Sequence, residues 1–179
     1  ALEKVAGTAE DTADFSYREA REALQSAIET LEVLRPQYDA LRAYSQQRKT
    51  YRTIVDALNR EEWQRQAPNA YQSMATAEQR ANSAEERRNW SRAAAALERF
   101  ETTYRAHQEA VERARTKARE ALDGIREKLT GELAQRIRQM TPEKWRDMQD
   151  KLEQANEAFE QFRYGAVESV ATTVAPAVD

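Results

Sequence analysis

The feature that most constrains this chain is a heptad pattern of apolar residues. From residue 17 to residue 41, apolar side chains recur in alternating steps of three and four, the spacing of one helix face that packs on another helix. The members are Tyr17, Ala20, Leu24, Ala27, Leu31, Leu34, Tyr38 and Leu41. A half-buried strand would need a period of two, so the pattern predicts a long helix with one apolar face.

A second heptad pattern runs from residue 90 to residue 125. Its two apolar positions hold Trp90, Leu97, Tyr104, Val111, Ala118 and Ile125 in one series and Ala93, Phe100, His107, Ala114 and Ala121 in the other. Pro68 lies in a polar stretch between the two patterns, and it is the best candidate for a chain reversal. A reversal near residue 66 pairs the two helices antiparallel, with Tyr38 near Ala94, Tyr44 near Arg88 and Tyr51 near Ala81.

The composition supports long helices packed side by side. Ala, Glu, Arg, Leu and Lys make up about half of the 179 residues, which is typical of coiled coils. Four Gly and four Pro are too few for the turns of a β-sandwich or barrel. Because Ala is abundant and large apolar residues are few, we expect a narrow seam in which rings and Leu pack against methyl groups.

The sequence therefore predicts an all-α fold, an elongated antiparallel coiled-coil hairpin or a three- to four-helix bundle with long kinked helices. Residues 16–164 are expected to form one elongated domain, after a flexible lead-in at 1–15 and before an extended or disordered tail at 165–179. The helices are expected at about 16–63, 69–82, 84–140 and 142–164.

Local signals set these boundaries. Three helix starts are predicted from local motifs. Two are capping boxes, Ser16 with Glu19 and Ser83 with Glu86, and the third is the N-cap residue Thr141 followed by Pro142. Pro36 lies inside the first helix, but the heptad keeps its phase across it, so we expect a kinked, continuous helix. Gly124 and Gly131 weaken the third helix without breaking it, and Gly165 is expected to cap the last one.

The seam assignment carries a quantitative expectation. Replacing Leu31 or Leu97 with Ala should cost roughly 2 to 5 kcal/mol if both side chains are buried. The same change at Glu29 or Arg99, off the seams, should matter little.

The residue types offer little catalytic chemistry. The chain has no Cys and one His, so a thiol nucleophile and a thiolate zinc site are excluded. A di-iron site needs Glu three residues before His, whereas Tyr104 precedes His107 at that spacing. We expect His107 to be a polar residue at a seam or bundle edge, and we expect no catalytic, cofactor-binding or metal-binding residues. An enzyme is not expected.

Basic residues gather at two places, Arg87, Arg88 and Arg92, and then Arg113, Arg115, Lys117 and Arg119. Glu residues interleave with both groups, and several Glu–Arg pairs have the favourable spacing of four residues. With a net charge of −3, a mutually compensated helix surface is expected rather than a nucleic-acid site.

Partner contacts are expected at helix ends and in the tail. The candidates are Trp63, Tyr164, Val167, Val170 and Val174, because exposed aromatic groups are enriched in binding hot spots and an apolar tail can add a contact.

The resulting hypothesis is a non-enzymatic structural protein, an elongated helical spacer, adaptor or assembly subunit of a larger complex, whose partners are other protein subunits or further copies of itself. The alternative is an amphipathic helical protein that associates with a membrane surface or lipids, which the narrow, Ala-diluted stripe disfavours. No transmembrane segment is predicted. The first residue is Ala, which fits Met removal, a cleaved leader or trimming. Localisation stays open, with the cytoplasm slightly favoured over a secreted or periplasmic site.

Overall fold

The computed structural model describes residues 2–130 and 132–178, with side chains for 16–130, 135–139 and 141–174. Over these residues the chain forms seven helices and no strand, which confirms the all-α fold class. The helices are α1 (Leu2–Ala57), α2 (Arg60–Gln66), α3 (Pro68–Glu86), α4 (Trp90–Thr130), α5 (Glu132–Met140), α6 (Pro142–Glu160) and α7 (Tyr164–Val178).

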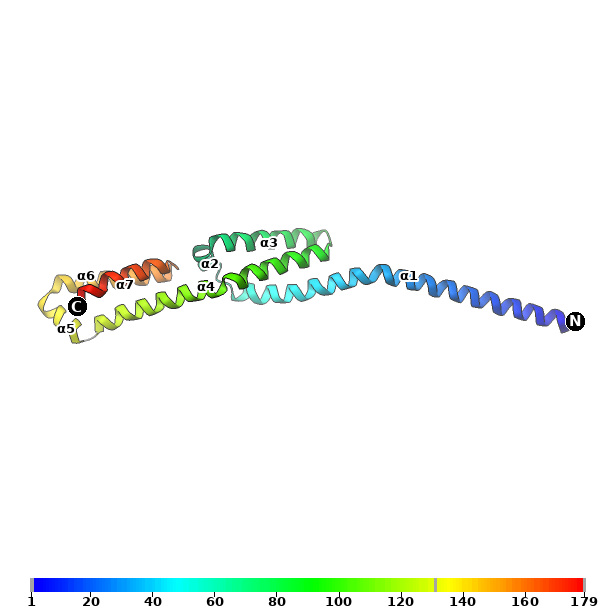
Figure 1. The fold of residues 1–179 in the computed structure, drawn as a ribbon, viewed down its shortest axis with the longest axis horizontal. Coiled ribbons are helices and arrows are strands. Elements are labelled where there is room, and N and C mark those ends of the chain that lie inside the picture. The colour runs from blue at the N-terminus through cyan, green and yellow to red at the C-terminus, as the bar shows by residue number, and fades with distance from the viewer. Residues whose placement is uncertain (1, 131, 179) are drawn as a thin grey trace.

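Two three-helix bundles lie end to end and share α4 (Figure 1). The C-terminal part of α1, α3 and the first half of α4 form the first bundle, and the second half of α4, α6 and α7 form the second. Helix α3 runs antiparallel to α1, and α4 then runs parallel to α1. The N-terminal half of α1 projects beyond both bundles, so the molecule is a long rod.

Rings packed against alanine fill the first bundle. Tyr44 lies against Trp90, with ring centroids 5.2 Å apart, and Tyr51 meets Phe100 edge to face at 5.0 Å. The small residues that face these rings are Ala77, Ala81 and Ala84 of α3 and Ala93 and Ala96 of α4. Tyr51 packs against the cluster that contains Ala81, as predicted, and the large-to-small matching gives the close helix approach that the composition indicated.

The second bundle buries the far part of the second heptad pattern. Ala118, Leu122 and Ile125 of α4 form one core with buried residues of α6 and α7. The members from those two helices are Met148, Ala155, Ala158, Tyr164, Val167 and Val174. The second heptad pattern, which we call the α4 seam, is thus confirmed over both bundles except at His107, and Leu97, which is 1% exposed, lies in the first of them.

A second chain reversal at residues 87–89 was not predicted. Helix α3 ends in a Schellman motif, in which the Asn89 amide donates to the Ala84 carbonyl and the Arg88 amide to the Glu85 carbonyl, both at 2.8 Å. Arg88 has a φ of 53°, and Asn89 Oδ1 caps α4 by accepting from the Arg92 amide at 3.1 Å. The predicted helix start at Ser83 is wrong, because Ser83 lies inside α3.

This reversal also corrects the predicted helix pairing. Helix α1 packs mainly on α4, which runs parallel to it, and not antiparallel as predicted. Its contacts with the antiparallel α3 include the ion pair of Arg48 with Glu85 at 3.2 Å and the hydrogen bond from the Tyr51 hydroxyl to Glu78. The pairing of Tyr38 with Ala94 is wrong, since the chain turns back before Ala94 and leaves Tyr38 exposed.

The C-terminal tail is a helix. The predictions that 165–179 is extended and that Gly165 caps a helix are wrong, because α7 begins at Tyr164 and buries Val167 and Val174 in the second core. The left-handed residue that ends α6 is Phe162, with a φ of 56°. The restart at Pro142 is confirmed, although Thr141 makes no side-chain capping bond. Asp179 lies outside the described residues.

The N-terminal boundaries also differ from the prediction. Helix α1 begins at Leu2, so 2–15 is helical backbone and Ser16 lies inside the helix. It continues through Pro36, as predicted, and ends at Ala57 instead of residue 63. Asn59 Oδ1 then caps α2 by accepting from the Glu62 amide at 3.1 Å. The predicted helix 84–140 corresponds to α4 and α5, and Gly131 between them lies outside the described residues.

Candidate interaction surfaces

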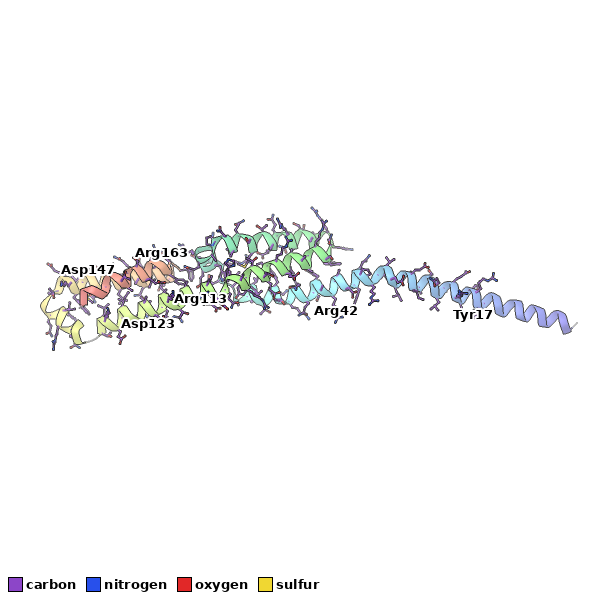
Figure 2. The ribbon with its side chains drawn as sticks, in the orientation of Figure 1. Tyr17, Arg42, Arg113, Asp123, Asp147 and Arg163 are labelled. Carbon is purple, nitrogen blue, oxygen red and sulfur yellow. The ribbon has the colours of Figure 1, made fainter. Side chains whose placement is uncertain are left out.

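The heptad face in the N-terminal half of α1 is exposed. We call its eight members, Tyr17, Ala20, Leu24, Ala27, Leu31, Leu34, Tyr38 and Leu41, the α1 seam. Tyr17 is 73% and Leu31 65% exposed, and every other member is exposed as well. Figure 2 shows Tyr17 on the part of α1 that extends alone, whereas Arg42 lies where the first bundle begins. The expectation that Leu31 is buried is therefore wrong for the chain by itself.

The seam is free because the first bundle starts after it. Among the side chains of α1 that the structure describes, from residue 16 on, the first buried one is Tyr44, three residues beyond Leu41, and the turn between α3 and α4 lies at that level. No described part of α3 or α4 extends further along α1. A helix of about 40 residues, on the order of 60 Å, therefore has no packing partner within the described chain.

Charged residues border one side of the α1 seam. With Tyr17 at heptad position a, the positions labelled e hold Arg21, Ile28, Arg35 and Arg42, and the positions labelled g hold Ala23, Thr30 and Gln37. The e and g side chains flank the interface of a coiled coil and contact its partner. The face is therefore apolar, basic along one edge and uncharged along the other.

A buried polar network joins the two bundles. Glu62 of α2 is 1% exposed, and its carboxylate accepts hydrogen bonds from Arg115 of α4, one of them from Nε at 2.7 Å, and from the hydroxyl of Tyr164 in α7. Beside it, the Gln66 side-chain amide donates to the Phe162 carbonyl. The network holds the end of the first bundle against the start of the second.

The network shifts the protonation of its members. Burial and the hydrogen bond to Glu62 raise the pKa of Tyr164 to about 12. The hydrogen bond to Glu62 also raises the pKa of the Arg115 guanidinium, which keeps it charged. A similar but less buried pair lies in the first bundle, where burial and the hydrogen bond to Glu78 raise the pKa of Tyr51 to about 12.

An open groove between α3 and α4 carries four arginines. Arg80 lines it from α3, Arg87 from the turn that follows, and Arg92 and Arg99 from α4, together with Ser and Thr hydroxyls. Within the described side chains these four guanidinium groups have no ion-pair partner. Of the two basic groups singled out in the sequence, Arg113 pairs with Glu109 and Arg115 with Glu62, whereas Arg87 and Arg92 form no ion pair among the described side chains.

The residues predicted to contact partners are core residues of this chain. Trp63, Tyr164, Val167 and Val174 are buried, and Val170 is half-buried against the second core. Trp63 stacks on Tyr104 with centroids 4.9 Å apart. The prediction that they form a free contact surface is wrong, because the chain turns back at both places and covers them itself.

His107 is exposed on α4, with Nδ1 3.0 Å from the Thr103 carbonyl oxygen. It is part of neither core, although Phe100 and Ala114, one heptad before and after it, pack into the first and against the second. Among the described residues, no three His, Asp or Glu side chains are grouped so that they could hold a metal ion. Within the same part of the chain, no helix has the length and apolar character needed to span a bilayer.

Comparison of the chain with protein-family models, with curated proteins and with solved structures finds no significant match.

Proposed function

We propose that this chain is a non-enzymatic interaction protein, an elongated helical spacer, adaptor or assembly subunit of a larger protein complex. The observation that carries the proposal is the exposed α1 seam. Single exposed apolar residues are ordinary, whereas a contiguous heptad face is typical of a helix that packs on another helix.

The energetics of isolated helices support this function. A helix in water without tertiary contacts is only marginally stable, because most helix stability in proteins comes from packing an apolar face. The N-terminal half of α1 has such a face but no described side chain of the bundles to cover it. Covering by another polypeptide would stabilise this half by mass action.

Affinity isolation from the native source tests the proposal. The bait is the full chain, compared with the double variant Leu31→Glu with Leu34→Glu and with the control Val33→Glu. Val33 is 67% exposed and lies off the seam, so the control makes the same apolar-to-acid change beside it. Polypeptides held by wild type and by the control but lost with the double variant are expected. Identical recovery with all three baits would contradict the proposal.

A second candidate function is association with an anionic membrane surface. It is favoured by Arg21, Arg35 and Arg42, which line one edge of the exposed face, because surface-bound amphipathic helices carry basic residues beside their apolar side. Co-sedimentation with vesicles rich in phosphatidylserine tests it. Binding that disappears at high salt and in the double variant would support this candidate, and a chain that stays in the supernatant would contradict it.

A further inference from the structure

We propose that the α1 seam closes against the α1 seam of a second copy of this chain, in an antiparallel two-stranded coiled coil. The inference rests on the proposed function and names its partner. The supporting observation is the size of the seam residues. When the two seams run antiparallel, each alanine of one seam lies opposite a large side chain of the other.

The complementarity is specific to one register. In an antiparallel coiled coil, each a residue packs against a d residue of the other helix. When the two-fold axis lies between the helices at the level of Glu29, every one of the eight members has a partner. The layers are Tyr17 with Leu41, Ala20 with Tyr38, Leu24 with Leu34, and Ala27 with Leu31, each formed twice. Both alanines thus face a large side chain, as alanine does throughout the first bundle.

A parallel pairing matches the same residues poorly. It places each residue opposite itself, so Ala20 and Ala27 form layers with only methyl groups, while Tyr17 and Tyr38 each face a second tyrosine ring. The alanine layers would leave voids and the tyrosine layers would be crowded, and both effects lower the stability of the dimer. The antiparallel register also places Ile28 beside Ile28 of the second copy at the axis, which extends the apolar contact.

The area is sufficient for a specific dimer. The overlap from residue 17 to residue 41 is about 37 Å long at 1.5 Å per residue. Eight exposed seam side chains from each copy, with Ile28, bury roughly 1,200 Å² in total, which is at the lower end of stable protein interfaces. We therefore expect a reversible dimer whose population depends on concentration.

The flanking charges predict a dimer that depends little on salt. In the antiparallel register, e residues face e residues, so Arg21 of one copy lies near Arg35 of the other, and Arg42 lies near Asp14. Each pair forms twice, one kind is repulsive and the other attractive, and salt screens both. Binding to an anionic vesicle should instead weaken as ionic strength rises.

Sedimentation velocity over a concentration series tests the association. Wild type and Val33→Glu are expected to dimerise, and the double variant Leu31→Glu with Leu34→Glu to dimerise at least tenfold more weakly. In dilute solution, where each chain is monomeric, circular dichroism and thermal unfolding should be the same in all three, because these side chains are exposed in the single chain. A wild-type chain that stays monomeric at every concentration, or a double variant that dimerises as well as wild type, overturns the inference.

Single cysteines test the orientation, since the natural chain has none. With a short bismaleimide crosslinker, Thr30→Cys is expected to give covalent dimers, because residue 30 lies next to the axis. Ala20→Cys is expected to give none, because the two positions are on the order of 27 Å apart in this register. The reverse result, with crosslinking at residue 20 and not at residue 30, overturns the antiparallel arrangement.

The outcomes separate this inference from the proposed function. A monomeric chain that holds a different polypeptide through the same face, lost with the double variant, overturns the second copy as occupant and leaves the interaction function standing. A monomeric chain that holds no polypeptide through this face, or binds only vesicles through it, overturns both.

Discussion

Replacing Glu62 with Gln should destabilise the junction between the two bundles. The change keeps the size of the side chain but removes its charge, so no cavity contributes to the result. Glu62 accepts three hydrogen bonds, two from the Arg115 guanidinium and one from the Tyr164 hydroxyl. Because Gln lacks the second acceptor oxygen, at least one of the bonds from Arg115 is lost.

The magnitude follows from the burial of the two partners. Breaking a fully buried ion pair costs about 3 to 5 kcal/mol. The Arg115 side chain is 41% exposed, so water can solvate its charge again once the pair is broken. We therefore expect a loss of about 2 to 3 kcal/mol in the free energy of unfolding.

Urea denaturation followed by circular dichroism measures this loss. The matched control is Glu61→Gln, an exposed carboxylate on the same helix that pairs with Arg65 at 3.8 Å, for which a change below about 0.5 kcal/mol is expected. Since the network joins the two bundles, the Glu62 variant should also unfold less cooperatively. A Glu62→Gln variant as stable as the Glu61 control would refute the reasoning.

Three further changes test the packing and the turns. Leu97→Ala should cost about 2 to 5 kcal/mol in thermal or urea unfolding, whereas Leu31→Ala should change the stability of the monomeric chain by less than about 0.5 kcal/mol, and equal losses would contradict the burial assigned to them. Tyr164 has a pKa of about 12 in the fold and about 10 when unfolded, so stability present below pH 10 should fall between pH 10 and 12, by up to about 2 to 3 kcal/mol. A Tyr164→Phe variant whose alkaline loss matches wild type would contradict that assignment. Arg88→Gly should raise stability by about 0.5 to 1 kcal/mol, because glycine adopts a positive φ without strain, and a lower melting temperature would contradict this.

Heptad spacing was enough to predict the seams but not what covers them. Leu97 and Leu31 occupy equivalent positions in similar patterns, yet one is buried and the other exposed. The pattern predicts that a helix face packs against another helix, but it does not indicate whether that helix belongs to the same chain or to another. That is why the α4 seam was predicted correctly, while the burial of Leu31 was not.

The turns and the last helix were missed for local reasons. Arg88 and Phe162 take up left-handed conformations that glycine usually provides, so neither turn has the expected sequence signal. Asn89, a good helix N-cap, was the one available indication of the second reversal. In α7, the β-branched residues suggested an extended tail, but burial of Val167 and Val174 outweighs their weak local preference.

The polar network could not be found from sequence. Glu62 is one of many glutamates, and its partners lie 53 and 102 residues away in the chain. Nothing in the local sequence distinguishes it from Glu61, which is exposed. Only the fold, by turning the chain three times, brings α2, α4 and α7 together.

Hydrogen–deuterium exchange across a dilution series tests the central claim most directly, with residues 44–57 of α1 as an internal reference. The account predicts that amides at 17–41 exchange rapidly in dilute chain and become protected as concentration rises, whereas those at 44–57 are protected throughout. It also predicts that Leu31→Glu with Leu34→Glu abolishes the concentration-dependent protection and that Val33→Glu preserves it. Protection at 17–41 that is independent of concentration, or equal in the double variant, would contradict the account.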